Sequence, residues 1–237
     1  MKIRIAYIEE PPFYWTTPDG AVTGADIELA HAVLHAVGVT EIEHVPVAFD
    51  ELLSGVSQGR WDMNVPIFIT PERAQHVGFS VPVWALGDGF LVRPGNPRAL
   101  DSYAALAAQG DARLAVIADQ VQSGSAQAAG VSADQLTVFQ DQIEAIAALV
   151  AGRVDAFAAT ALGNRVAAQG NPAVHAVAHQ AGATAPVGGF SFAKTDDKLR
   201  RAVDAQLRRY LGSAEHRASA AGFGITSTEI DPVLEKV

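Results

Sequence analysis

The sequence predicts an α/β protein made of two lobes. Strand and helix signals alternate along its 237 residues, which is typical of mostly parallel sheets flanked by helices. Two apolar, glycine-flanked stretches, residues 87–93 and 188–194, stand outside this alternation. We interpret them as hinge strands that cross between the lobes. Lobe 1 then comprises residues 1–90 and 190–237, and lobe 2 is an insertion of residues 91–189.

In lobe 1, the spacing of apolar residues separates predicted strands from predicted helices. Thr70-Pro71 is a strong start signal for a helix, because threonine caps the first turn and proline suits the first helical position. The predicted order is strand 3–8, helix 26–37, strand 44–48, a helix capped by Asp50, strand 62–67 and a helix from Thr70.

The second half of the chain repeats the alternation. Asp141 and Glu144 have the spacing of a capping arrangement for a helix that ends near Gly152. The predicted elements are strand 114–118, this capped helix, strand 154–159 and an amphipathic helix over 197–211.

The composition excludes several classes of function. A net charge of −9 argues against nucleic acid and anionic membranes as partners, because both need a cationic face. The chain has no cysteine, and its 7 histidines show no metal-ligand spacing. The sequence also contains no phosphate loop, nucleophile elbow or paired-carboxylate motif. We therefore predict no catalytic residue, no metal ion and no cofactor.

The sequence shows neither a membrane span nor a signal peptide. No run of about 18 apolar residues occurs. Residues 3–7 already alternate like a strand, directly behind the first two residues. If the protein is exported, we expect its leader to have been removed from this sequence.

Arg73 is a candidate ligand-binding residue. It lies in the first turn of the helix predicted from Thr70, where the helix dipole favours anions over cations. A guanidinium at this place needs a negative neighbour, and a ligand carboxylate would pair with it bidentately. The alternative is an ion pair with Glu72 or another acidic residue.

Several aromatic residues lie at predicted strand ends. Phe13 follows the first strand, Phe49 precedes the helix cap Asp50, and Phe68 ends the strand before Thr70. Ligands bind at strand ends in open α/β sheets, and aromatic faces suit a delocalised cation. Glu10, in the first loop, could face the same cation. The alternatives are hydrophobic plugs beneath loops and a solvated glutamate.

Five segments, taken together in order and spacing, carry a family resemblance. They are Pro11-Pro12-Phe13, residues 19–30, Gly59-Arg60-Trp61-Asp62, Ile69-Thr70-Pro71-Glu72-Arg73 and residues 151–156. The chain resembles the family-3 polar amino-acid-binding proteins of ABC importers, which have the type II periplasmic-binding fold with two lobes joined by two crossover strands. The resemblance implies a non-enzymatic, periplasmic or extracytoplasmic monomer. It implies that lobe closure captures a ligand for a membrane permease, with Arg73 on the ligand carboxylate.

Departures from the family pattern bear on the ligand. Pro66 and Phe68 stand where family members place small hydroxyl residues, and Thr160 stands where they tend to carry an aspartate for the α-ammonium. A buried primary ammonium without those partners would lose several kcal/mol, roughly, whereas a methylated or delocalised cation has few N–H groups to satisfy.

One branch of the family, the ectoine- and hydroxyectoine-binding proteins, is similar in these respects. It implies a cage of Phe13, Phe49 and Phe68 around a delocalised cation, with Glu10 on its N–H groups and Arg73 on the carboxylate. A betaine-type amine is the second expected ligand and a polar amino acid the third. The alternative of another class is an enzyme similar to the cyclohexadienyl and arogenate dehydratases, with Glu10 as the acid.

The second-lobe contacts follow from the same resemblance. Family members place a glycine-serine or glycine-threonine loop after the strand at 114–118, where this chain has Asp119 and Gln120. A shifted alignment would use residues 122–125 in their place. We predict Asp119, Gln120 and Thr160 as ligand contacts from lobe 2.

Overall fold

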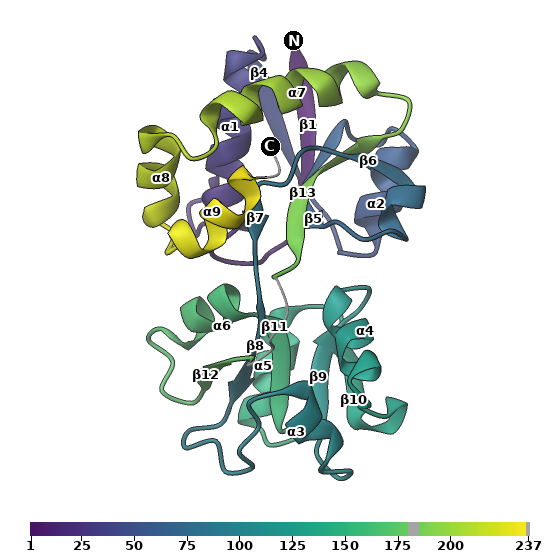
Figure 1. The fold of residues 1–237 in the computed structure, drawn as a ribbon, viewed down its shortest axis with the longest axis vertical. Coiled ribbons are helices and arrows are strands. Elements are labelled where there is room, and N and C mark those ends of the chain that lie inside the picture. Colours follow the sequence, from purple (N-terminus) through teal and green to yellow (C-terminus); the bar gives the residue numbers. More distant parts are fainter. Residues whose placement is uncertain (180–184, 236–237) are drawn as a thin grey trace. The chain divides into compact units, whose positions relative to one another are not determined.

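A computed structural model describes residues 1–179 and 185–235, and the chain divides into two compact units (Figure 1). Unit 1 takes the described residues of Met1–Leu86 and Ala185–Val237, and unit 2 takes those of Gly87–Thr184. The predicted lobe 2 includes residues 180–184, which lie outside the described residues. Within the described part of the chain, no helix is both long and apolar enough to cross a membrane.

The sheet of unit 1 combines parallel and antiparallel strands. Its order is β4-β1-β5-β13-β6, and β7 also pairs with β13. The strand β1 is parallel to β4 and β5, whereas β13 is antiparallel to β5, β6 and β7. The strands are β1 (Lys2–Tyr7), β4 (Glu41–Pro46), β5 (Met63–Phe68), β6 (Val77–Phe79), β7 (Trp84–Ala85) and β13 (Val187–Ala193). A small hairpin, β2 (Trp15–Thr16) with β3 (Val22–Thr23), follows the first loop.

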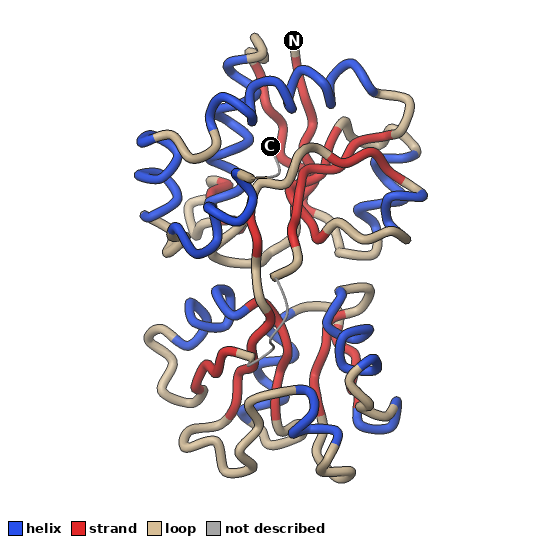
Figure 2. Tube along the Cα trace, in the orientation of Figure 1, coloured by secondary structure: helices blue, strands red, loops and turns tan. Residues whose placement is uncertain are grey.

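Helices flank this sheet (Figure 2). The amphipathic helix α7 buries Leu199, Val203 and Leu207, which are spaced four residues apart and so share one face. In the same unit, α1 packs against both α7 and α8. The helices are α1 (Ala25–Ala36), α2 (Glu51–Ser57), α7 (Asp197–Tyr210), α8 (Ala214–Ala221) and α9 (Ser227–Leu234).

The helix predicted from Thr70 is a single 3-10 turn, Arg73–Gln75. The predicted cap is present, because Thr70 Oγ1 accepts a hydrogen bond from the Arg73 amide at 3.1 Å. The helix stops because Val77 already pairs with β13 as the first residue of β6. Arg73 therefore lies in a tight connection between two strands of one sheet.

The sheet of unit 2 has the order β10-β9-β11-β8-β12. Here β9, β10 and β11 are parallel, and β8 is antiparallel to β11 and β12. The strands are β8 (Asp88–Val92), β9 (Leu114–Ile117), β10 (Leu136–Phe139), β11 (Ala156–Thr160) and β12 (His175–Ala178). The helices are α3 (Tyr103–Ala107), α4 (Val121–Ala128), α5 (Gln142–Val150) and α6 (Ala161–Ala168).

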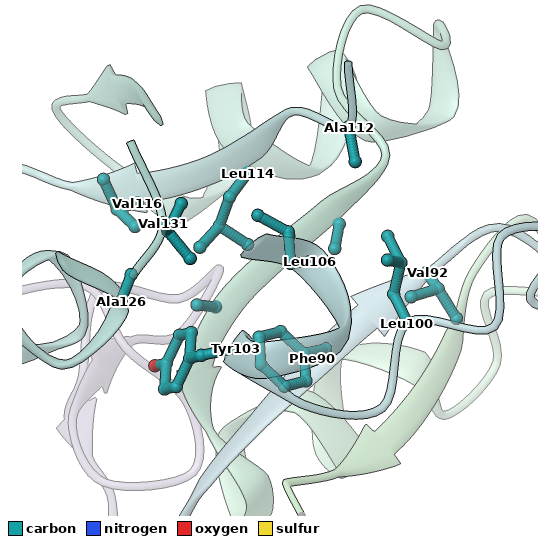
Figure 3. Close-up of a cluster of buried hydrophobic side chains, with 12 residues drawn as sticks. Phe90, Val92, Leu100, Tyr103, Leu106, Ala112, Leu114, Val116, Ala126 and Val131 are labelled. Atoms are coloured by element: carbon teal, nitrogen blue, oxygen red, sulfur yellow. The ribbon is translucent and has the colours of Figure 1, made fainter. Parts of the chain in front are cut away.

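Apolar side chains cover both faces of the unit 2 sheet. On one face Phe90 packs edge-to-face on Tyr103 with ring centroids 5.0 Å apart, next to Leu106 and Leu114 (Figure 3). A second buried cluster, which includes Phe157 and Leu149, covers the other face under α5. Because adjacent residues of a strand point to opposite faces, the near-continuous apolar runs of β9 and β11 are explained by burial on both sides.

The structure confirms the predicted fold class: two α/β units, each a sheet with flanking helices. The prediction of mostly parallel sheets holds for β4-β1-β5 and β10-β9-β11, and the remaining strands are antiparallel. Of the two predicted hinge strands, β8 lies within the unit 2 sheet and β13 within the unit 1 sheet. In chain order, the parallel strands of both sheets are arranged second, first, third.

A buried histidine predicts acid sensitivity of unit 1. His216 is 6% exposed, and its Nδ1 accepts a hydrogen bond from the Gly212 amide at 3.1 Å. Burial, with a smaller effect of the neighbouring Arg217 charge, lowers the pKa of His216 from 6.5 to about 4. The unfolded chain therefore binds a proton below about pH 6.5 that the folded protein does not. The contribution of the neutral His216 side chain to the free energy of unfolding is fully present above pH 6.5 and is lost as the pH falls towards 4.

We expect His216→Asn to reduce this pH dependence, because asparagine offers an acceptor oxygen that does not titrate. Between pH 6.5 and 4 the wild type should lose roughly 2 kcal/mol more unfolding free energy than the variant. Urea unfolding at several pH values measures the difference. Equal slopes for both proteins would contradict the prediction, and His35→Asn, at an exposed position of α1, is the matched control.

Candidate functional site

The predicted site residues of unit 1 lie at one edge of its sheet. The strands β4, β1 and β5 are parallel, so their carboxyl ends meet at the same edge. The chain leaves β1 towards β4 on one side and later adds β5 on the other, which makes this edge a topological switch point, the usual place of a ligand site in such sheets. Glu10 and Phe13 follow β1, Phe49 follows β4, and Phe68 ends β5 shortly before Arg73.

Arg73 is buried and fixed by its neighbours. The residue is 7% exposed, and its Nη1 donates to the Phe68 carbonyl at 3.0 Å. The guanidinium carbon lies 5.1 Å from the centroid of the Phe49 ring, within the range of a cation–π contact. A buried, oriented guanidinium of this kind suits a planar anion such as a carboxylate.

Phe13 and Phe68 are linked by a ring that the sequence reasoning missed. Trp84, on β7, packs edge-to-face on Phe68 at 5.1 Å and lies 6.3 Å from Phe13, measured between ring centroids. Room for this indole comes from Gly188 on β13, where a Cβ atom would lie 2.0 Å from the Trp84 ring. We name Phe13, Trp84 and Phe68 the aromatic wall. Trp84 lies across from Gly188 in the β7–β13 pairing, a contact between residues far apart in the sequence, so local spacing did not indicate it.

An acidic group lies beside the aromatic wall. The Tyr14 side chain hydrogen-bonds to Glu10, and the Glu10 amide donates to the Tyr14 carbonyl at 2.8 Å. Burial first, then the charges of Glu10 and Asp26, raise the pKa of Tyr14 well above its ordinary value, and the Arg73 charge opposes them. These effects place Glu10, Asp26 and Arg73 in the electrostatic surroundings of one phenol. Asp26 and Tyr14 received no role in the sequence-based prediction.

The predicted residues of unit 2 also lie at a carboxyl edge of a sheet. Because β9 and β11 are parallel, Asp119, just past β9, and Thr160, at the end of β11, lie at the same edge. Asp119 has a positive φ of 59°, and Gln120 is the N-cap residue of α4. Thr160 Oγ1 accepts a hydrogen bond from the Gly163 amide at 3.1 Å and so caps α6.

The alternative segment of unit 2, residues 122–125, belongs to α4. One of its residues donates a hydrogen bond to a carboxylate of the same unit. Gln122 Nε2 and the Tyr103 hydroxyl each donate to Asp88 at 2.8 Å. Burial raises the pKa of Asp88, and these hydrogen bonds oppose the shift. Asp88 lies directly across the β8–β11 ladder from Thr160.

The parallel strands of the two sheets share one order, and both sheets carry polar residues at their carboxyl edges, joined in unit 1 by aromatic residues. This arrangement defines a two-lobed binding protein of the type II periplasmic-binding fold. The family model for bacterial extracellular solute-binding proteins, family 3, matches residues 3–220. The chain belongs to this family.

The chain is also similar to individual proteins of known sequence or structure. A relative from Sinorhizobium fredii, named "Probable amino-acid ABC transporter periplasmic-binding protein y4tE", is 32% identical over 247 residues, covering 99% of this chain and 80% of that protein. The crystal structure of EhuB in complex with hydroxyectoine has a TM-score of 0.88 and 29% identity, covering 98% of this chain and 94% of that chain.

A third similar structure is the ancestral amino acid-binding protein AncCDT-1, described as a precursor of cyclohexadienyl dehydratase. Its TM-score is 0.82 and its identity 26%, and the likeness covers 94% of either chain. The family resemblance predicted from the sequence is therefore confirmed.

Proposed function

We propose that this protein is the extracytoplasmic solute-binding component of an ABC importer, and that its ligand is ectoine, hydroxyectoine or a similar small zwitterion. In this proposal Arg73 binds the ligand carboxylate. The cation rests on the rings of Phe13, Phe49 and Phe68, and Glu10 accepts hydrogen bonds from its N–H groups. From unit 2, contacts by Asp119, Gln120 and Thr160 remain predictions.

The observation that carries the proposal is the set of aromatic residues around the Arg73 guanidinium. The buried guanidinium lies over Phe49 and donates to the carbonyl of Phe68, whose ring is joined through Trp84 to Phe13. Aromatic faces attract a delocalised cation without needing its N–H groups, so this edge suits a ligand with separated opposite charges. The likeness to EhuB, solved with hydroxyectoine, supports the same ligand class.

A polar α-amino acid is the second candidate ligand, because y4tE and AncCDT-1 carry amino-acid names. Such a ligand has the same carboxylate for Arg73 but a primary ammonium with three N–H donors to satisfy. A dehydratase is the candidate of another class, supported by the description of AncCDT-1 as a precursor of such an enzyme. Incubation with prephenate or arogenate tests it, and formation of an aromatic product would support that alternative.

Isothermal calorimetry tests the proposed ligand. Ectoine and hydroxyectoine are expected to bind, glycine betaine to bind more weakly, and arginine, lysine, glutamine and histidine to give little heat. Tight binding of one of these amino acids, with no response to ectoine or betaine, would overturn the proposal.

Phe68→Ser is expected to weaken ectoine binding by about 1–2 kcal/mol, because it removes one ring face from the cation. Phe68→Leu keeps most of the apolar volume and loses only the aromatic face, so it should show a similar loss if the ring acts through its π-system. Calorimetry on both variants measures the effect. Unchanged affinity in both would assign Phe68 to packing alone.

A further inference from the structure

The aromatic wall is anchored through Asp26. This residue lies in the first turn of α1, and its backbone amide donates to the Phe13 carbonyl at 3.0 Å. Its carboxylate accepts the indole N–H of Trp84, with Nε1 at 3.2 Å from Oδ1 and 3.4 Å from Oδ2. Asp26 therefore binds two residues of the aromatic wall: the backbone of Phe13 and the side chain of Trp84.

Asp26 and Trp84 are both buried, so each needs the hydrogen bond between them. The residue is 1% exposed, and no salt bridge to it occurs among the described residues. Burial raises the pKa of its carboxyl well above the ordinary value, and the Trp84 hydrogen bond opposes the shift. A buried carboxyl is retained at a free-energy cost unless it is hydrogen-bonded. The indole N–H of Trp84 likewise needs an acceptor, because the residue is 5% exposed.

Trp84, held by Asp26, in turn packs against Phe68. The indole occupies the space above Gly188, which pairs with Trp84 on one side of β13 and with Phe68 on the other. A turned indole would therefore lose its edge-to-face contact with Phe68 or collide with the backbone of β13.

We propose that Asp26 is a positioning residue for the ligand cation, which fixes Phe13 through its amide and Trp84 through its carboxyl group. The inference rests on the proposed function, because it assumes that the rings of the aromatic wall bind the ligand cation. It adds Asp26 and Trp84 to the residues that determine ligand specificity, although neither needs to touch the ligand.

The test compares Asp26→Asn with Asp26→Ala. Asparagine keeps an acceptor oxygen for the indole, whereas alanine removes it. Indole N–H exchange with water is followed by NMR, and Trp84→Phe identifies the Trp84 signal among the 3 tryptophans. We expect Asp26→Ala to accelerate exchange of the Trp84 indole at least about 10-fold. Its ectoine affinity should also fall about 10-fold, the size of a lost cation–ring contact. Asp26→Asn should stay within about 3-fold of the wild type in both.

The outcomes separate positioning from a structural role. Faster indole exchange with unchanged ectoine affinity in Asp26→Ala would overturn the proposal, as would an indole that stays protected without Asp26. Failure of ectoine to bind the wild type would instead overturn the proposed ligand. The same comparison made with arginine, the amino-acid alternative, then decides the role of Asp26.

Discussion

Arg73→Ala is expected to reduce ectoine affinity at least about 100-fold, or roughly 3 kcal/mol. The ligand carboxylate would lose its charged, bidentate partner in a place where solvent cannot replace it, since Arg73 is 7% exposed. Arg73→Lys keeps the charge but not the planar fork, so an intermediate loss is expected. Calorimetry against ectoine measures all three proteins.

The fold of the Arg73 variants has to be checked separately, because the guanidinium also donates to the Phe68 carbonyl at 3.0 Å. Thermal unfolding shows whether the loss of this bond destabilises unit 1. Arg217→Ala is the matched control. It removes an ion pair with Asp231, at 2.6 Å, and a hydrogen bond from Arg217 Nε to the Gly212 carbonyl, at 3.0 Å, and should leave ectoine affinity unchanged. An Arg73→Ala variant that binds ectoine within a few-fold of wild type would contradict the assignment of Arg73 to the carboxylate.

The parts of the site that could be predicted from the sequence depend on local spacing. Phe68 and Arg73 lie five residues apart on one connection, and the Thr70 cap that turns the chain between them is itself a local signal. The same locality misled the prediction of a full helix from Thr70. A cap indicates where a helix begins, but its length here is set by the pairing of β6 with β13, a long-range contact.

Trp84 and Asp26 could not be assigned in the same way. Their roles come from packing between β7, β13, the first loop and α1, which are distant in the chain. In the sequence, Asp26 looks like an ordinary acidic residue in the first turn of a helix, where the dipole favours it. Only its burial and the indole N–H show that it points inward.

The close approach of α1 to the first loop leads to the second large expected effect. Gly24 precedes α1 with a φ of +135°, and a Cβ atom there would lie 2.1 Å from the Phe13 carbonyl oxygen. This oxygen cannot move away easily, because it accepts the Asp26 amide at 3.0 Å, and the Ala25 amide holds the Pro12 carbonyl at the same distance.

Gly24→Ala should therefore destabilise unit 1 by about 3–4 kcal/mol, the sum of a backbone collision and an unfavourable φ. Gly20→Ala is the matched control. That glycine also has a positive φ, of +86°, but among the described residues a Cβ atom there would meet nothing within 4 Å beyond its chain neighbours. A loss of only about 1 kcal/mol is therefore expected from Gly20→Ala.

Urea unfolding gives both values, and calorimetry should show weaker ectoine binding in Gly24→Ala alone, because Phe13 is displaced from the aromatic wall. Equal destabilisation by the two substitutions would mean that the strained φ, and not the contact with Phe13, makes glycine necessary at position 24.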